Sequence, residues 1–139
     1  MNFKQIYIGQ LIETRVVEKG IEIARICNFM DCSEKEITEM YSAENLETGI
    51  LLRWSKLLEY DFFRLYTQHL ILYAPPSSDS HTDVKESAMP QFRKNIYTKE
   101  VISFILEMIE TNEKTKSQII EDYKIPKTTL YKWIKKYDL

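Results

Sequence analysis

Glycine and proline are scarce in this chain. Only 3 Gly and 4 Pro occur among its 139 residues, which are otherwise rich in Glu, Lys, Leu and Ile. This composition favours helices over a turn-rich β fold. No apolar run approaches the roughly 18 residues that a membrane span needs. The start of the chain, residues 1–4, also lacks the apolar stretch of a signal peptide. We therefore expect a cytoplasmic, all-α protein without membrane segments.

Cysteine and histidine are equally scarce. Cys27 and Cys32 lie five residues apart, and His69 and His81 are distant from both. This spacing does not match that of zinc ligands, and a disulfide framework is not expected in a cytosolic chain of this size. The sequence also has no glycine-rich phosphate loop. It therefore predicts no catalytic residue, no metal site, no cofactor and no enzyme activity.

Charge is balanced overall but not along the chain. The 19 basic and 21 acidic residues give a net charge of −2. Residues 1–74 have a net charge of −3, whereas residues 91–139 have a net charge of +3. The stretch from Lys124 to Lys136 contains five lysines and no acidic residue. A local excess of this kind indicates where an anionic partner would bind, although the overall charge does not.

A polar segment separates the two halves. It starts with Pro75-Pro76 and continues with Ser, Asp and His residues. Such a segment cannot bury enough apolar surface to offset the entropy of ordering it. We predict a flexible linker at 75–90, with one small helical domain at 1–74 and a second at 91–139.

The first domain reads as five helices. Apolar residues at helical spacing predict them at about 6–19, 22–30, 33–41, 48–58 and 61–73. Gly20 is suited to end the first helix, and Ser33 with Glu36 has the spacing of a capping box. The apolar stripes place Ile23 and Leu52 among the core residues.

Three stretches of the first domain follow a known pattern: Ile8-Gly9-Gln10-Leu11-Ile12, Glu18-Lys19-Gly20-Ile21 and the stretch from Leu51 to Phe63. Through them, residues 6–73 resemble the Xre-type, lambda-repressor-like domains of bacteria. In that family the third helix reads DNA. Here its outward side carries Lys35, Glu36, Thr38 and Glu39, and an excess of carboxylates repels phosphate. This side is a second DNA face or a face for a protein partner.

The sequence of the second domain predicts three helices, at about 98–111, 115–123 and 126–137, with Thr98 and Thr115 as candidate N-caps of the first two. In the last helix, Leu130, Trp133, Ile134 and Tyr137 follow helical spacing and predict the core side. Thr128, Lys132 and Lys135 centre on the opposite side, with Tyr131 and Lys136 flanking them and Lys127 near the amino end. Lysine binds phosphate, and threonine can bond to phosphate or to base edges. These residues by themselves are consistent with two interpretations: a DNA-binding face, or a solvated basic face that closes a three-helix bundle.

Residues 91–137 contain a specific motif, Ile125-Pro126-Lys127-Thr128-Thr129-Leu130-Tyr131-Lys132-Trp133. Through this motif, the second domain closely resembles the helix-turn-helix of insertion-sequence transposase subunits and related homeodomain-like domains. The resemblance implies that the last helix enters the major groove and that its DNA contacts come from Lys127, Thr128, Thr129, Tyr131, Lys132 and Lys135. Lys136 extends the same face. Two residues depart from the family pattern: Ile120 replaces a small residue, and Lys124 replaces the turn glycine.

Two hypotheses follow. The first is a DNA-binding protein, either a transcriptional regulator or the DNA-recognising subunit of a mobile element. Its partners would be double-stranded DNA and either a second copy of the chain or a separate transposase catalytic chain. The second hypothesis is a protein-interaction or dimerisation module. Its acidic N-terminal bundle would bind a partner or regulate the basic C-terminal bundle.

Overall fold

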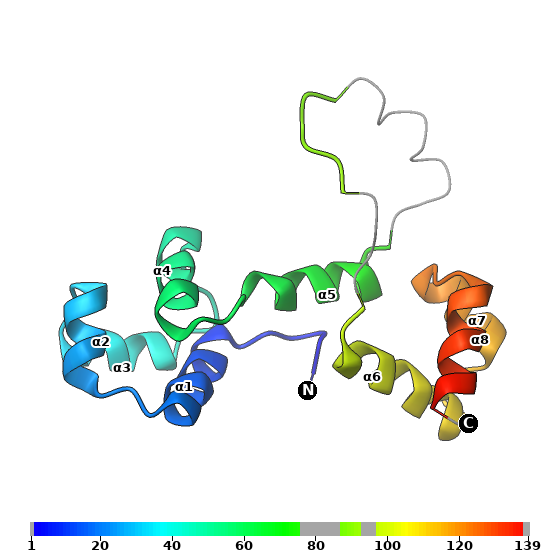
Figure 1. Ribbon diagram of the computed structural model, residues 1–139, viewed down its shortest axis with the longest axis horizontal. Helices are drawn as coiled ribbons and strands as arrows, with labels where there is room; N and C mark the ends of the chain where they lie inside the picture. Colours follow the sequence, from blue (N-terminus) through cyan, green and yellow to red (C-terminus); the bar gives the residue numbers. More distant parts are fainter. Residues whose placement is uncertain (1, 76–86, 93–96, 138–139) are drawn as a thin grey trace. The chain divides into compact units, whose positions relative to one another are not determined.

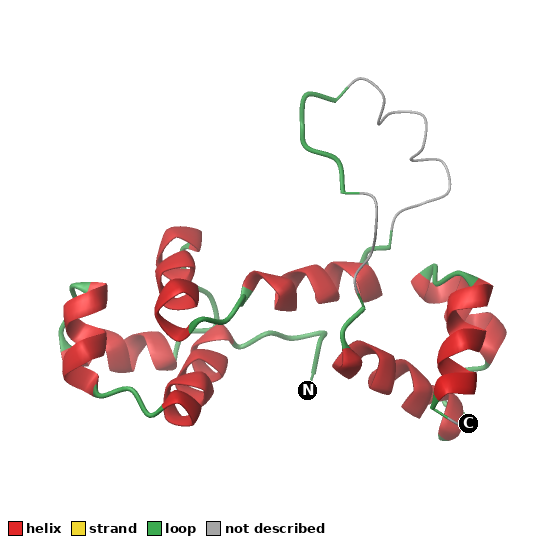
Figure 2. Ribbon diagram, viewed as in Figure 1, coloured by secondary structure: helices red, strands yellow, loops and turns green. Residues whose placement is uncertain are grey.

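The computed structural model describes residues 2–75, 87–92 and 97–137, and all regular structure within these ranges is helical (Figures 1 and 2). The helices are α1 (Ile8–Lys19), α2 (Ile23–Met30), α3 (Glu34–Tyr41), α4 (Thr48–Leu58), α5 (Phe63–Tyr73), α6 (Lys99–Glu110), α7 (Lys116–Tyr123) and α8 (Lys127–Lys136). The predicted all-α fold is confirmed, and the predicted helices match these bounds to within about two residues.

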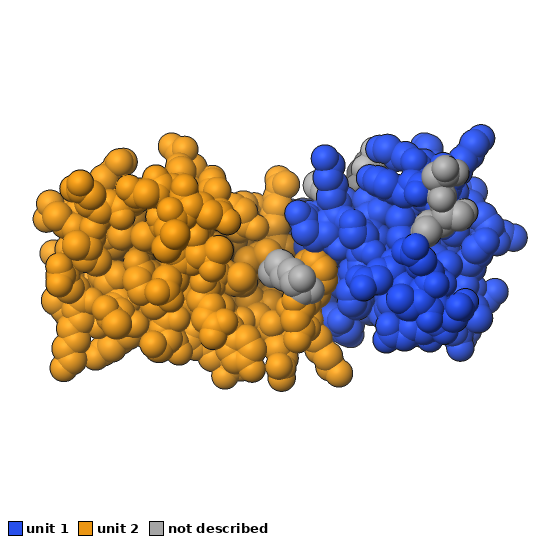
Figure 3. Space-filling model, turned by 90° about the horizontal axis from the view of Figure 1, so that it is seen from below, with its two compact units in different colours: residues 1, 67–139 blue, residues 2–66 orange. Residues whose placement is uncertain are grey.

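The contacts divide the chain into two compact units (Figure 3). The N-terminal unit contains residues 2–66, and the C-terminal unit contains the chain from Thr67 onward. The division falls inside α5, so the second half of this helix belongs with α6–α8. Most of the predicted linker at 75–90 lies outside the described residues. The domain boundaries at 74 and 91 therefore stay predictions.

The N-terminal unit is a bundle in which α1 and α2 each pack against both α3 and α4. Its fully buried side chains come from all of these helices and from the segment that precedes α5: Ile8, Ile12, Ile26, Ile37, Trp54, Leu58 and Phe62. Trp54 also donates a hydrogen bond from its ring N–H to the Met40 sulfur at 3.3 Å. This core holds α3 with Ile37 inward and its polar residues outward.

A close backbone approach joins α1 to the end of α3. The Gly9 N–H donates to the Ala43 carbonyl at 3.0 Å. A side chain at Gly9 would collide with the Met40 carbonyl oxygen and would lie 2.6 Å from the Tyr41 carbonyl oxygen. Glycine is therefore required here by the separation of the two backbones, because its φ is not in the left-handed region.

In the C-terminal unit, α6 and α7 both pack against α8. The fully buried apolar residues are Leu72 of α5 together with Val101, Ile105, Ile119, Ile125 and Leu130. Trp133 closes this core and meets the ring of Tyr97 edge-on, with the ring centroids 4.9 Å apart. The α5 residue Gln68 is also buried, and its side-chain oxygen accepts a hydrogen bond from the Thr98 N–H at 3.4 Å.

Three residues predicted to lie in the core are in fact exposed. Ile23 is 39% exposed, Leu52 47% and Tyr137 44%. Each lies near an end or a flank of its helix, where the helical period alone does not reveal how far the neighbouring helix extends. In α4 the buried row runs through Leu51 and Trp54, and Leu52 points about 100° away from Leu51. Trp54, which was not predicted as a core residue, is fully buried.

Side-chain caps start three of the helices. The Ser33 hydroxyl accepts from the Glu36 N–H at 3.2 Å, which confirms the predicted cap. The reciprocal half of that capping box differs, because the Glu36 carboxylate accepts from the Ser33 hydroxyl instead of the Ser33 N–H. Thr98 caps α6 as predicted. Thr115 and Gln118 form a complete capping box at α7, which satisfies two N–H groups that the helix leaves free.

Each unit contains a pair of helices joined by three residues. Residues 31–33 join α2 to α3, and residues 124–126 join α7 to α8. Both connections begin with a left-handed residue other than glycine, Asp31 at φ 54° and Lys124 at φ 53°. The connection between α7 and α8 therefore requires a positive φ at position 124. A glycine would adopt this φ without strain, whereas Lys124 does not.

Candidate nucleic-acid interface

The amino end of α8 is set by Pro126, which has no N–H and a φ of −57°. Proline is favourable at this point because the first N–H groups of a helix have no partner within the helix. Along α8, Leu130, Trp133 and Ile134 are buried against α6 and α7. Burial of this row turns the rest of the helix toward solvent.

We call the solvent-facing residues of this helix the α8 face. It contains Lys127, Thr128, Thr129, Tyr131, Lys132, Lys135 and Lys136, so the structure brings together all seven predicted contact residues of the C-terminal domain. Thr129 is half-buried and the other six are exposed. Tyr137, which was predicted to lie on the core side, adds an exposed ring at the end of the helix.

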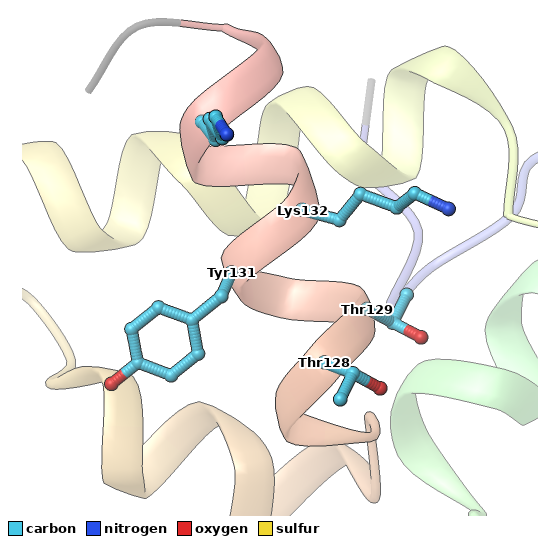
Figure 4. Close-up of a pocket in the computed structure, with 5 residues that line it drawn as sticks. Thr128, Thr129, Tyr131 and Lys132 are labelled. Atoms are coloured by element: carbon cyan, nitrogen blue, oxygen red, sulfur yellow. The ribbon is translucent and has the colours of Figure 1, made fainter.

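The centre of the α8 face is a row at i, i+3, i+4 and i+7, formed by Thr128, Tyr131, Lys132 and Lys135. Together with Thr129 these residues line an open hollow of about 400 Å³. Figure 4 shows Thr128, Thr129 and Lys132 pointing to one side of the helix and Tyr131 to the other. Residues at this spacing lie one above the other on a helix, so they can meet a single surface together.

Two lysines make cation–π contacts with the ring of Tyr131. The Lys116 ammonium lies 5.5 Å from the ring centroid and the Lys127 ammonium lies 5.7 Å from it, both within the range of cation–π contacts. Lys116 is the first residue of α7, so this contact crosses from one helix to the next. Sequence reasoning did not place Lys116 in the site. The period of one helix carries no information about residues that approach from another helix.

Within the described part of the chain, no carboxylate pairs with a lysine of the α8 face. With other described residues, Lys127, Lys132, Lys135 and Lys136 make no ion pair. Asp122, the nearest acidic residue before α8 in the chain, is bound at 2.6 Å by Lys114. This hydrogen bond raises the pKa of Lys114. Lys114 also lies over the ring of Tyr123. It is thus engaged away from the α8 face.

The α3 face, defined as Lys35, Glu36, Thr38 and Glu39, is exposed as predicted. Its hydrogen-bonding groups are partly occupied. The Thr38 hydroxyl donates to the Glu34 carbonyl at 2.9 Å, and Glu36 accepts from Ser33. The exposed Glu34 adds a third carboxylate to the same short helix. This surface has one cation among three carboxylates.

The two cysteines lie in the N-terminal unit, away from the α8 face in the sequence. Cys27 and Cys32 are free and half-buried, and the Cys32 thiol donates to the Met30 carbonyl at 3.3 Å. Burial and the Glu36 carboxylate raise the pKa of the Cys32 thiol, so it is less reactive than an ordinary cysteine. Within the described ranges, His, Cys, Asp and Glu side chains form no group of three that could hold a metal ion. No helix of these ranges has the length and apolar character needed to cross a membrane.

Comparisons with known protein families, with curated proteins and with solved structures give no match to this chain.

Proposed function

We propose that this chain binds double-stranded DNA by placing α8 in the major groove, as a transcriptional regulator or as the DNA-recognising subunit of a mobile element. The observation that carries the proposal is the α8 face, an exposed helix surface with four lysines that no described carboxylate neutralises. Electrostatic attraction to phosphate supplies most of the non-specific affinity for DNA, and it requires such uncompensated charge.

The local backbone also suits this use. A short helix, a three-residue turn and a second short helix make up α7–α8. In helix-turn-helix proteins the second helix of such a pair lies in the major groove. The ten residues of α8 extend over about 15 Å, and the groove is about 12 Å wide.

The positions on α8 suggest a division of roles. Lys127 and Lys136 lie on the two flanks of the face, where the sugar–phosphate walls of the groove would run. Lys116 approaches the same flank as Lys127, through the ring of Tyr131. Contacts to phosphate set the register of a protein on DNA, whereas contacts to base edges determine which sequence it prefers.

The acidic α3 face favours a second role for the N-terminal unit. Three carboxylates around one lysine would repel a phosphate backbone, so this surface fits a protein partner with basic groups better than DNA. The partner could be a second chain or the basic C-terminal unit itself. Replacing Glu36 and Glu39 by Gln is expected to leave DNA affinity unchanged if α3 stays away from the duplex. A large rise in affinity would show that these carboxylates oppose DNA binding, either beside the phosphates or against the basic C-terminal unit.

Fluorescence anisotropy of a labelled random-sequence duplex, titrated with the full chain at several salt concentrations, tests the main proposal. We expect micromolar binding with a log–log salt slope of about −3 to −5, as three to five phosphate contacts would give. Lys127→Ala with Lys136→Ala should weaken the slope by about 2 units. Lys56→Ala with Lys99→Ala removes the same charge from exposed positions elsewhere and should leave the slope nearly unchanged. Absence of binding at low salt would favour the protein-interaction function instead.

A further inference from the structure

We infer that the α8 face selects DNA sites in which guanines and a thymine follow one another in the major groove. The inference rests on the proposed function and deepens it, because it names the bases that the face can read. It is carried by the kinds of side chain present on the central row and by the way Tyr131 is held.

The α8 face has a restricted set of hydrogen-bonding groups. Its polar side chains are lysine, threonine and tyrosine only, and α8 contains no Arg, Asn, Gln, Asp or Glu. Asparagine and glutamine make the bidentate contact that identifies adenine, and carboxylates accept from the cytosine amino group. Neither contact can be made from α8.

Lys132 and Lys135 are suited to guanine. They lie three residues apart in the second half of the exposed row and line the same hollow. Neither forms an ion pair with another described residue, so both ammonium groups are available. Guanine presents two acceptors, N7 and O6, in the major groove, and lysine is one of the two side chains that commonly bind them.

Thr128 is suited to thymine. It lies on the same row, one turn before Lys132, and points to the same side of the helix as Lys132 (Figure 4). Its side chain offers a methyl group, and apolar contact with the C5 methyl is the feature by which proteins recognise thymine. A thymine is therefore expected beside the guanine that Lys132 binds.

Tyr131 is assigned to the backbone instead of the bases. Its ring lies close to Lys116 and Lys127, toward the flank of the α8 face away from Thr128 and Lys132. Two ammonium groups within 5.7 Å of the ring centroid place positive charge around this side chain, which favours a phosphate neighbour. The readout then comes from Thr128, Lys132 and Lys135.

Selection of bound duplexes from a randomised pool, using the full chain, gives the first test. We expect the enriched sites to share adjacent guanines and a thymine on one strand. Replacing each selected guanine by 7-deazaguanine, which lacks the N7 acceptor but still pairs with cytosine, should weaken binding about fivefold to tenfold. In Lys132→Ala, and likewise in Lys135→Ala, 7-deazaguanine should no longer weaken binding at one of the guanines. The reason is that the variant has already lost the lysine contact to the N7 atom of that guanine.

The thymine contact has its own test. Replacing the selected thymine by uracil removes one methyl group and should weaken binding about fourfold. Thr128→Ser keeps the hydroxyl and removes the protein methyl, so the variant should bind the thymine and uracil duplexes equally. Thr14→Ser is the control, because Thr14 is an exposed helical threonine in α1 and should leave the fourfold difference unchanged.

The outcomes separate this inference from the proposed function. Duplex binding with no enriched sequence, with sites lacking guanine, or with no response to 7-deazaguanine would overturn the guanine–thymine readout and leave DNA binding standing. Lack of binding to any duplex would overturn both. If Thr128→Ser still binds the thymine duplex more tightly than the uracil duplex, while 7-deazaguanine weakens binding as expected, the thymine contact alone is overturned.

Discussion

The α2–α3 pair and the α7–α8 pair share a backbone plan and differ in chemistry. In each, an eight-residue helix is followed by three connecting residues, the first of them left-handed, and by a second short helix. The second helix presents three carboxylates and one lysine in α3, but four lysines and no carboxylate in α8. Local geometry therefore does not determine the partner, because function depends on the side chains that the geometry displays.

The surroundings of the cations strengthen this contrast. In the N-terminal unit, Lys19 binds Glu59 at 3.0 Å, Arg15 binds Glu18 at 3.3 Å and Arg64 binds Asp61 at 3.2 Å. These surface pairs add little stability, but they offset three of the positive charges of the unit. On α8, ion pairs with other described residues are absent, so its charge is free to attract an anion.

The largest effects are expected from replacing a tryptophan, because each unit has one tryptophan in its core and its free energy of unfolding can be changed separately. Trp54 lies in the N-terminal core and Trp133 in the C-terminal core, and they are the only tryptophans of the chain. Replacing either by Ala should cost its own unit about 3–5 kcal/mol in free energy of unfolding. Urea denaturation followed by the fluorescence of the remaining tryptophan, together with circular dichroism, measures both units.

The two tryptophan variants should also differ in DNA binding. Trp133→Ala should abolish it because the variant no longer holds α8, and Trp54→Ala should retain it. If the remaining tryptophan reports the same loss of stability in both variants, the two units unfold together and the comparison between them fails.

A smaller effect is expected at Gly9. A Cβ at this position meets the carbonyl groups at the end of α3, so Gly9→Ala should destabilise the N-terminal unit by about 1–3 kcal/mol. The urea transition seen by Trp54 should move to lower concentration, and that seen by Trp133 should not move.

Gly49→Ala is the matched control. Gly49 lies near the start of α4, where an added Cβ meets no atom within 4 Å. This substitution should stabilise the unit by about 0.5–1 kcal/mol, because alanine loses less entropy in a helix. Equal destabilisation by both substitutions would contradict the close approach of α1 and α3.

The two left-handed turn residues give the next test. Lys124→Gly should stabilise the C-terminal unit by about 1 kcal/mol, because a residue with a Cβ is strained at φ 53°. Asp31→Gly should stabilise the N-terminal unit by less, since aspartate adopts this conformation more readily. Thermal denaturation of both variants measures the difference. A loss of stability in Lys124→Gly would show that the lysine side chain itself supports the turn.

The smallest expected effect is a dependence on alkaline pH. Burial raises the pKa of Tyr41 and of Tyr66 in the N-terminal unit. The folded state therefore holds these protons more tightly than the unfolded state. The associated stability is fully present below about pH 10 and is lost as the pH rises through the raised values. Urea denaturation followed by Trp54 at pH 8 and at about pH 10.5 should show the loss, and Tyr41→Phe should reduce it.

Much of this fold could be predicted from the helical period and the capping residues. The spacing of Ile8, Ile12 and Val16 indicates α1, and the caps at Ser33 and Thr98 mark two helix starts. Burial at the flanks was harder to predict. Leu52 and Tyr137 fit the apolar stripes of their helices but are exposed, because the width of each buried stripe depends on how far the neighbouring helices extend.

The helices, the acidic and basic surfaces and the seven residues of the α8 face follow from the amino-acid sequence alone. These features depend on the period of a single helix and on the side chains that it carries. Packing between helices is what brings Lys116 to Tyr131, requires a glycine at position 9 and places Asp122 within reach of Lys114. Each of these contacts joins segments whose separation in space depends on packing between helices, and no local pattern in the chain encodes that separation.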